Sequence, residues 1–369
     1  MMKTIPLIKP YITDEVKQKV SEVLDSGYIT EGPVTREFEN IFKNYIKCDF
    51  SLAVTSCTTG LEIALRALNV GPGDEVIVPD YTYPATANIA AIAGAKPIIV
   101  DISKDSMLID YDKIENAITK KTKAIIPVSL FGNPLDYSIL TSLKDKYGIF
   151  IVEDAACSIG AEYNGKMVGN LADISVFSLH PRKFITTGEG GNIACNNSTW
   201  YEWMLSYKHF GMGVHDSRLT TKFDRIGTNY KLSDILSAVG LVQMYHIDDL
   251  LSKRRELSHN YIDMLGKTPG IKIPKITDGG KHSYQSFCIF VENRDDIILK
   301  MRQRGIECQI GTYSLHMHKA FKDENIFQIS GSMDGSTYAF NHCLTLPLYH
   351  EMTAEEQEYV VNALRKAIK

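Results

Sequence analysis

The chain has 369 residues, 44% of them hydrophobic and 23% charged, and its 40 basic and 44 acidic side chains leave a net charge of −4. A globular protein of about two domains has this composition, whereas the lack of a basic block argues against a nucleic-acid binder. No run of about 18 apolar residues predicts a membrane span, and residues 1–15 lack the pattern of a signal peptide. We therefore expect a cytoplasmic protein with no nucleic-acid or membrane partner.

Between about residues 50 and 200, short β-rich apolar runs alternate with amphipathic runs. The predicted strands lie at residues 51–55, 74–81, 96–102, 123–131, 149–155, 174–179 and 191–196. The predicted helices lie at residues 58–68, 83–95 and 135–148. This alternation predicts a mostly parallel sheet with both faces covered, and such sheets bind ligands at the carboxyl ends of their strands.

The pattern changes after about residue 230. Residues 231–267 keep helical periodicity over an unusual length, and a predicted strand at 282–293 and helix at 294–305 follow. A last helix follows Thr353, with Glu356 at the position that a capping box requires. We expect a large α/β domain over residues 1–245 and a small α+β domain over residues 246–369.

The cysteines form no recognisable metal or disulfide pattern. They are Cys48, Cys57, Cys157, Cys195, Cys288, Cys308 and Cys343. No CxxC pair occurs, so the sequence predicts neither a zinc site nor a disulfide framework. We expect reduced thiols that pack as small residues, and no bound metal.

Two glycine-containing segments come close to nucleotide-binding motifs without matching them. "GAEYNGKM" (160–167) fits G-x-x-x-x-G-K, but Met167 stands where the motif needs Ser or Thr; we expect a hairpin or a surface turn there. The glycines at 188–191 run directly into the strand-like "IACN" and form no GxGxxG. We expect them to let the backbone turn tightly.

The segment "TSCTTGLEIAL" (55–65) places small hydroxyl residues between a strand and a helix. Free N–H groups at a helix start attract phosphate, and the backbone of Cys57 and Thr58, with a hydroxyl of Ser56 or Thr58, could supply such contacts. The alternative is plain N-capping by Ser56 or Thr58. The segment alone leaves both interpretations open.

A carboxylate and a lysine follow two successive strands. In "FIVEDAACS" (150–158), Asp154 stands where a buried strand leaves the sheet; an unpaired acid is costly there, so it needs a cationic partner unless it is a structural or capping residue. Ser178 and Lys183 follow the next strand, and neighbouring strands would place them at the same sheet edge as Asp154. The pyridinium of pyridoxal 5′-phosphate (PLP) is commonly paired with an Asp, and a desolvated lysine can form a Schiff base with it. Together with a phosphate-binding helix start, these residues predict a PLP site.

With these motifs in place, the sequence resembles the DegT-type sugar aminotransferases, a branch of the fold type I, aspartate-aminotransferase-like PLP enzymes, and in particular their perosamine-synthase-like members. The similarity covers nearly the whole chain and includes "DSGYITEGPVTREFE", "TSCTTGLEIALRALNVGPGDEVIVPDYTYPATAN", "EDAACSIGAEYNGKMVG", "FSLHPRKFITTGEGG", "GTNYKLSDILSAVGLVQM" and "HSYQSF". It implies a large domain with a mostly parallel, seven-stranded sheet and a smaller C-terminal domain.

The resemblance also implies roles for individual residues. Lys183 would form the Schiff base with PLP and Asp154 would pair with the ring nitrogen. Tyr83 would stack on the ring, and Ser178, Thr58 and the Cys57 N–H would hold the phosphate. Asn229 would reach the phosphate in the neighbouring subunit, which implies a homodimer with shared active sites.

The substrate side rests on the resemblance alone. Members of this family transfer an amino group, usually from L-glutamate, to a nucleotide-linked keto-deoxysugar by a ping-pong mechanism, and we favour amination at C4. The substrate-side candidates are Thr30, Glu31, His180 and Tyr313. A small ketose phosphate as acceptor, or a non-catalytic regulator that keeps the fold, are the alternatives.

Two positions depart from the family pattern. Cys157 replaces a Gln or His that often follows "EDAA", which puts a supporting contact to cofactor or substrate in doubt. Lys231 stands where Arg is common, and a lysine cannot form a bidentate fork with a carboxylate or phosphate.

Overall fold

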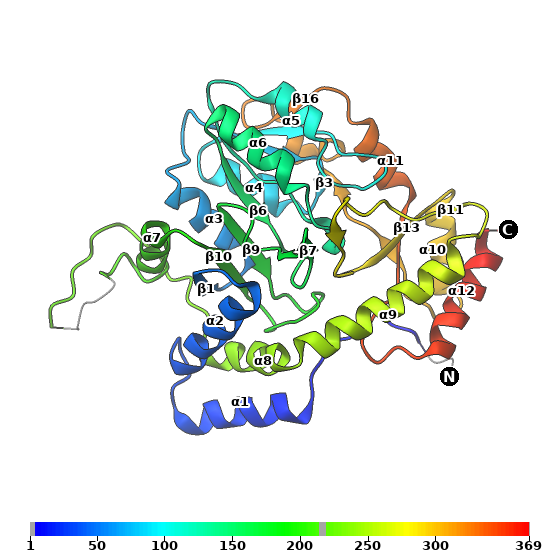
Figure 1. The fold of residues 1–369 in the computed structure, drawn as a ribbon, viewed down its shortest axis with the longest axis horizontal. Coiled ribbons are helices and arrows are strands. Elements are labelled where there is room, and N and C mark those ends of the chain that lie inside the picture. Colours follow the sequence, from blue (N-terminus) through cyan, green and yellow to red (C-terminus); the bar gives the residue numbers. More distant parts are fainter. Residues whose placement is uncertain (1–3, 214–218, 369) are drawn as a thin grey trace.

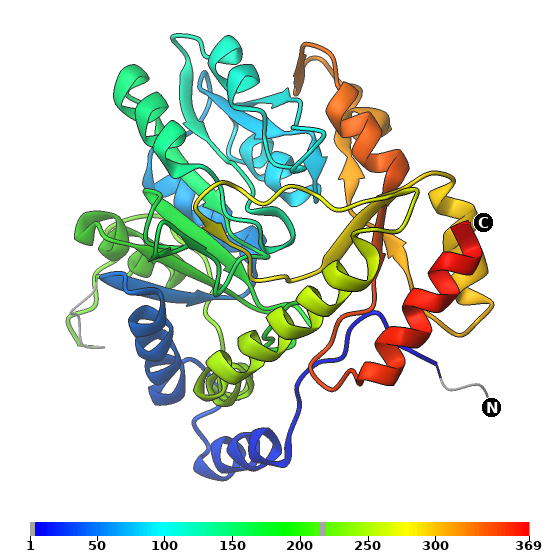
Figure 2. The same ribbon diagram turned by 45° about the vertical axis from the view of Figure 1, so that its right-hand side comes forward.

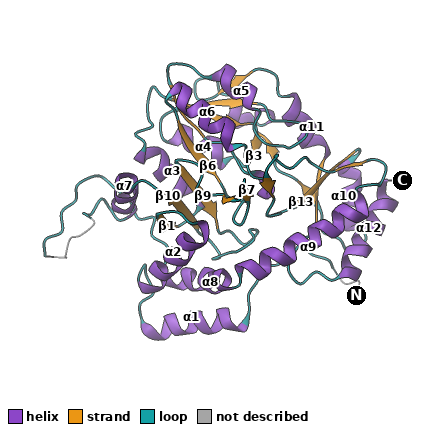
Figure 3. Ribbon diagram, in the orientation of Figure 1, coloured by secondary structure: helices purple, strands orange, loops and turns teal. Residues whose placement is uncertain are grey.

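The computed structural model describes residues 4–213 and 219–368, and its centre is one large sheet with helices on both faces (Figure 1; Figure 3). In spatial order its strands are β1 (Phe50–Val54), β10 (Gly191–Cys195), β9 (Ile174–Ser178), β6 (Phe150–Asp154), β5 (Thr122–Ile125), β2 (Glu75–Pro79), β4 (Lys96–Val100) and β16 (Gln328–Ser330). Only β10 runs antiparallel to its neighbours. The seven strands expected from residues 50–200 are all present, and the eighth, β16, joins from the C-terminal part of the chain.

Each face of the sheet has its own apolar core. One core includes α2 (Pro33–Ile46), α5 (Tyr111–Ala117) and α6 (Tyr137–Tyr147), with α8 (Asp234–Tyr245) on α2 and α1 (Asp14–Ser26) on α8. The other core contains α3 (Cys57–Ala67), α4 (Ala85–Ile92) and α7 (Ser198–Lys208). Along β2, Ile77 belongs to the first core and Val76 and Val78 to the second. Side chains alternate between faces, so a sheet covered on both sides needs the continuous apolar runs seen in the sequence.

The C-terminal part forms a smaller sheet with its own core. Its strands, in spatial order, are β11 (Ile271–Lys272), β13 (Phe287–Val291), β17 (Cys343–Leu346) and β14 (Gln309–Ile310). The helices α9 (Ile247–Leu265), α10 (Arg294–Arg302) and α12 (Ala354–Ile368) pack against it. The Glu356 N–H donates to Thr353 Oγ1 over 3.2 Å and the Thr353 N–H to Glu356 Oε2 over 3.1 Å, which confirms the capping box before α12.

The long helical segment after residue 231 is two helices rather than one. His246 separates α8 from α9, and α9 then runs from the large sheet to the C-terminal helices (Figure 2). We keep the boundary between the two domains at this break as a proposal. None of the helices in residues 4–213 and 219–368 is long and apolar enough to cross a membrane.

Shorter elements connect the two parts. One small sheet pairs β3 (Tyr81–Thr82) with β15 (Tyr313–Ser314). Another has three strands, in the order β12 (Gly280–Lys281), β7 (Glu162–Tyr163) and β8 (Lys166–Met167). Helix α11 spans Asp334–His342. The β7–β8 pair is the hairpin expected in place of a P-loop. At the N-terminus, Ile5 bridges to Ile306, so the chain's start packs with the C-terminal core.

Candidate active site

A cavity of about 670 Å³ opens at the carboxyl ends of β6 and β9 and reaches the C-terminal strands. Its lining includes eight predicted site residues: Lys183, Asp154, Ser178, Cys57, Thr58, Tyr83, His180 and Tyr313. Strands β6 and β9 are parallel neighbours, with Asp154 opposite Val176. This pairing brings Asp154 and the segment after β9 to one sheet edge, as the sequence predicted.

The start of α3 forms one wall of this cavity. The Thr59 N–H donates to Ser56 Oγ and the Ser56 N–H donates to Thr59 Oγ1, both over 3.1 Å, so Ser56 caps the helix. Cys57 and Thr58 are the first helical residues, and N–H groups at these positions have no acceptor within the helix. The capping alternative is therefore correct for Ser56, and it leaves the first backbone donors available to an anion.

A glycine lets β10 pass close to this helix start. A Cβ atom on Gly191 would lie 2.6 Å from the Cys57 nitrogen and from the Ser56 carbonyl carbon. Any side chain at 191 would therefore push the turn at Ser56 and Cys57 away from the sheet. Gly188, in the same run, has a φ of +89°, a conformation that favours glycine.

Asp154 is buried and lacks a cationic partner. Thr86 Oγ1 donates to its Oδ2 over 2.8 Å and the Ala156 N–H to its Oδ1 over 3.2 Å, but within the described chain no Lys or Arg forms an ion pair with it. Burial raises the pKa of the Asp154 carboxyl, although these hydrogen bonds and the charge of Lys183 oppose that rise. A cationic group from outside the chain would remove this cost.

The neighbouring acid, Glu153, is in a different situation. Its carboxylate accepts hydrogen bonds from the hydroxyls of Ser129, Tyr137 and Ser175 on the opposite side of the strand. Because these donors satisfy it and it does not line the cavity, Glu153 is a structural acid.

Lys183 lies on the loop after β9 and points at a thiol. Its Nζ donates to Cys157 Sγ over 3.2 Å. Burial opposes the charged form, but the Cys157 and Cys57 thiols and the Asp154 carboxylate outweigh it and raise the pKa of Lys183. Cys157, the departure from the family pattern, is thus in direct contact with the lysine, which the sequence could not show.

Aromatic and polar side chains form the rim. The β3–β15 ladder brings Tyr83 and Tyr313 together, with ring centroids 6.4 Å apart, and both rings are exposed. His180 lies on the rim with its Nε2 4.0 Å from Glu189. From the C-terminal part, Tyr313 was predicted to contribute, whereas Gln285 was not, although its "HSYQSF" motif belongs to the resemblance.

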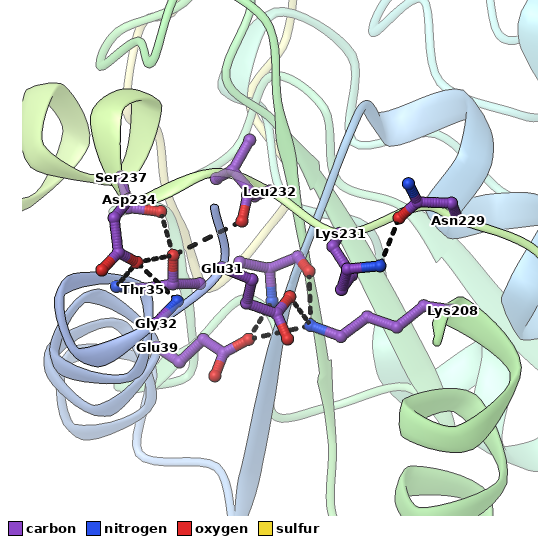
Figure 4. A network of polar contacts seen from close by, with 11 residues as sticks. Glu31, Gly32, Thr35, Glu39, Lys208, Asn229, Lys231, Leu232, Asp234 and Ser237 are labelled. Atoms are coloured by element: carbon purple, nitrogen blue, oxygen red, sulfur yellow. Dashed lines mark hydrogen bonds and ion pairs between the residues drawn. The ribbon is translucent and has the colours of Figure 1, made fainter. Parts of the chain in front are cut away.

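Three predicted site residues do not line the cavity of this chain. Figure 4 shows Glu31 in an ion pair with the buried Lys208 at 2.7 Å, and Asn229 accepting from Lys231 Nζ over 2.6 Å. The Thr30 carbonyl accepts from the Asp234 N–H over 3.0 Å, and Thr30 itself is exposed. Within one subunit these residues form a polar network near α2 and α8 rather than part of the cavity.

The cavity has the groups that PLP requires. A helix start offers backbone donors to a phosphate, a buried carboxylate without a cation suits a protonated ring nitrogen, and an amine lies in the same space. Among the described residues, no group of three or more His, Cys, Asp or Glu could hold a metal ion.

Comparison with known proteins agrees with this chemistry. The model of the DegT/DnrJ/EryC1/StrS aminotransferase family matches residues 10–365. The spore coat polysaccharide biosynthesis protein SpsC of Bacillus subtilis is 29% identical, over 99% of this chain and 97% of SpsC. The PLP-form of the putative sugar aminotransferase Spr1654 from Streptococcus pneumoniae superposes with a TM-score of 0.92, at 30% identity and over 99% and 98% of the two chains. For DesV of S. venezuelae the TM-score is 0.93, at 30% identity and over 99% of both chains. The chain therefore belongs to the DegT/DnrJ/EryC1/StrS aminotransferase family, whose cofactor is PLP.

Proposed function

We propose that this aminotransferase moves an amino group from L-glutamate to a nucleotide-linked keto-deoxysugar, with amination at C4. The observation that carries the chemistry is that Lys183, Asp154 and the start of α3 face one cavity. The sugar acceptor is supported by the relatives, since SpsC is described as a polysaccharide biosynthesis protein and Spr1654 as a putative sugar aminotransferase.

Different residues of the chain would hold the phosphate, the ring and the ring nitrogen of the cofactor. Ser178, the Thr58 hydroxyl and the Cys57 N–H would hold its phosphate, Tyr83 would cover the ring, and Asp154 would pair with the ring nitrogen. When bound, PLP withdraws electrons from the bond that breaks and carries the amino group between the two substrates. Asp154 favours this because a carboxylate at the nitrogen keeps it protonated.

Lys183 supplies both the attachment point and the proton transfer. After Cys157 and Cys57, Asp154 is one of the groups that raise the pKa of Lys183. A cationic nitrogen beside Asp154 would remove this contribution and so favour the neutral amine. The Lys183 Nζ would take the proton from the donor's α-carbon and deliver it to the cofactor's former aldehyde carbon, on the other side of the transferred nitrogen, the role of a positioned general acid and base.

The residues outside the cavity fit a homodimer with shared active sites. The described part of the segment between α7 and α8 extends from the body of the protein (Figure 1), and its Leu219 and Ile226 side chains are 98% and 95% exposed. Apolar side chains gathered on a surface are typical of interaction sites. In such a dimer Asn229, Thr30 and Glu31 would serve the partner's cavity, while His180 and Tyr313 would contact the acceptor in their own.

A substrate panel tests this function. The purified enzyme is incubated with L-glutamate and either nucleotide-linked 4-keto sugars, nucleotide-linked 3-keto sugars or small ketose phosphates, and 2-oxoglutarate release is measured. We expect turnover with a 4-keto sugar and none with the ketose phosphates. Turnover confined to ketose phosphates would overturn the proposed acceptor, and absence of glutamate-dependent turnover of any keto compound, in a protein that binds PLP, would overturn the donor.

A further inference from the structure

A single amide side chain holds the backbone on both sides of Lys183. Gln285 Nε2 donates to the Arg182 carbonyl oxygen, and the Phe184 N–H donates to Gln285 Oε1, both over 2.6 Å. Gln285 is 5% exposed and comes from the loop before β13, in the C-terminal part of the chain. A two-point bond of this kind fixes both the position and the direction of the chain at Lys183.

The loop needs such a bond because it has no regular structure of its own. Residues 180–190 belong to no helix or strand, and the Lys183 N–H is bonded locally, to the His180 carbonyl over 2.8 Å. A lysine side chain has four rotatable methylenes. The place of its Nζ therefore depends on how firmly the Cα of residue 183 is held.

A buried arginine holds Gln285 in turn. Arg254, on α9, is 1% exposed, and its Nη1 donates to the carbonyls of Gln285 over 2.8 Å and Tyr284 over 3.2 Å. Burial lowers the pKa of Arg254 to about 9, so its guanidinium is still charged at neutral pH. No carboxylate pairs with it within the described residues. The contacts that Arg254 makes in the fold must therefore offset the free-energy cost of burying its charge.

Arg254 also packs against Phe184, the residue after Lys183. The guanidinium carbon of Arg254 lies 5.1 Å from the centroid of the Phe184 ring, and the His350 ring meets Phe184 edge-on at 5.5 Å. A guanidinium over an aromatic face is attractive, more so when it is desolvated. The segment 182–184 is thus fastened by backbone bonds and by its aromatic side chain, in each case to residues after 245.

We propose that Gln285 is the positioning residue for Lys183, with Arg254 as its support. The proposal rests on the role of Lys183 in the proposed function, but not on the identity of the sugar. Displacement of a reacting group by about 1 Å can cost roughly 100-fold in rate. Gln285 also lines the cavity, but both hydrogen bonds of its side chain go to the backbone that flanks Lys183.

The test compares two buried glutamines that hold the same loop. Gln243, on α8, accepts from the Thr186 N–H over 3.1 Å and donates to the Thr186 carbonyl over 2.6 Å. Gln285→Leu removes the bonds that flank Lys183, and Gln243→Leu removes equivalent bonds three residues further along. Gln285→Glu keeps the acceptor for the Phe184 N–H but loses the donor to Arg182.

Two of the measurements do not depend on catalytic activity. Backbone amide exchange at Phe184 reports the bond to Gln285, and the rate at which a small aromatic aldehyde and cyanoborohydride modify Lys183 in the cofactor-free protein reports the placement of Nζ. For Gln285→Leu we expect faster exchange at Phe184, a changed rate of Lys183 modification, and a 10- to 100-fold lower kcat with KM for glutamate within about threefold. Gln285→Glu should recover part of each loss.

For Gln243→Leu we expect kcat and Lys183 modification within about threefold of the parent, even if its melting temperature falls as far as that of Gln285→Leu. Equal losses of kcat in the two variants, or an unchanged modification rate in Gln285→Leu, would overturn the proposal. Because amide exchange and lysine modification do not depend on the acceptor, a wrong sugar assignment would leave these outcomes intact.

Discussion

Two lysines with little access to solvent, Lys183 and Lys208, have opposite surroundings. Lys208 is 1% exposed at its side chain, and its Nζ has three oxygen partners: Glu31 at 2.7 Å, Glu39 at 3.4 Å and the Ala53 carbonyl at 3.0 Å (Figure 4). Lys183 donates to one thiol and otherwise faces a cavity. An ammonium with a full set of oxygen partners is fixed in place, whereas one that lacks them is available for chemistry. Lys208 is fully buried, while Lys183 is only half-buried because one side of it faces the cavity.

The largest effect should come from Lys183. Lys183→Ala removes the attachment point and the general base together, and we expect transamination to fall at least about 1,000-fold with little change in the free energy of unfolding. The measurement is 2-oxoglutarate release, alongside urea denaturation. Retention of the parental rate would contradict the role of Lys183.

Replacing Lys208 should lower the stability of the fold, whereas replacing Lys183 lowers the activity. Lys208→Met leaves Glu31 and Glu39 without their cation, and breaking a buried ion pair typically costs about 3–5 kcal/mol. Urea denaturation at fixed protein concentration measures it. Adding Glu39→Gln to this variant should restore part of the stability, since burial already raises the pKa of Glu39 and penalises its charge. A loss below about 1 kcal/mol would show that the network in Figure 4 is not a structural ion pair.

The two neighbouring carboxylates at the end of β6, Asp154 and Glu153, should differ too. Asp154→Asn removes the anion that pairs with the ring nitrogen, and we expect kcat to fall by about 100-fold or more, with a changed absorbance spectrum of the bound cofactor. Glu153→Gln is the matched control, because Glu153 is equally buried but faces away from the cavity. It should lower stability while kcat stays within about threefold. If the two variants lose activity equally, the assignment of Asp154 fails.

The smallest effect concerns the thiol beside Lys183. Cys157 is the strongest of the groups that raise the pKa of this lysine. Removing it in Cys157→Ser should therefore lower that pKa, and Lys183 should lose its proton and react at lower pH than in the parent. The rate of Lys183 modification by an aldehyde between pH 7 and 10 measures this, with Cys288→Ser as a control thiol outside the cavity. A shift toward higher pH would contradict the pairing.

The main residues of the site could be predicted because their positions depend on nearby sequence, namely the strands that precede them. Asp154, Ser178 and Lys183 each follow a strand with a clear apolar pattern, and adjacent parallel strands bring their ends together. The cap at Ser56 was also visible, as one of two alternatives. Contacts that depend on packing between distant segments were not predictable. Gln285, for example, lies 101 and 103 positions after its two hydrogen-bond partners, Phe184 and Arg182.

The break at His246 and the strand β16 escaped prediction for related reasons. Apolar spacing continues through residues 231–267, so periodicity alone does not show the break at His246. The first turn of α9 still packs in the same core as α8, and only its later part reaches the C-terminal core. The three residues of β16 are largely exposed and too few to show alternation. Their strand conformation comes from pairing with β4.

The pairing of β16 with β4 has a consequence for how the protein is made. Ser330 pairs with Val100, so on the ribosome the open edge of β4 waits for more than about 200 further residues. At roughly 5–20 residues per second this takes on the order of ten seconds or more, and an unpaired strand edge is a template for aggregation. A chain released early, at residue 245, would keep that edge exposed permanently. We therefore expect a chain that ends at residue 245 to aggregate more readily than the full chain.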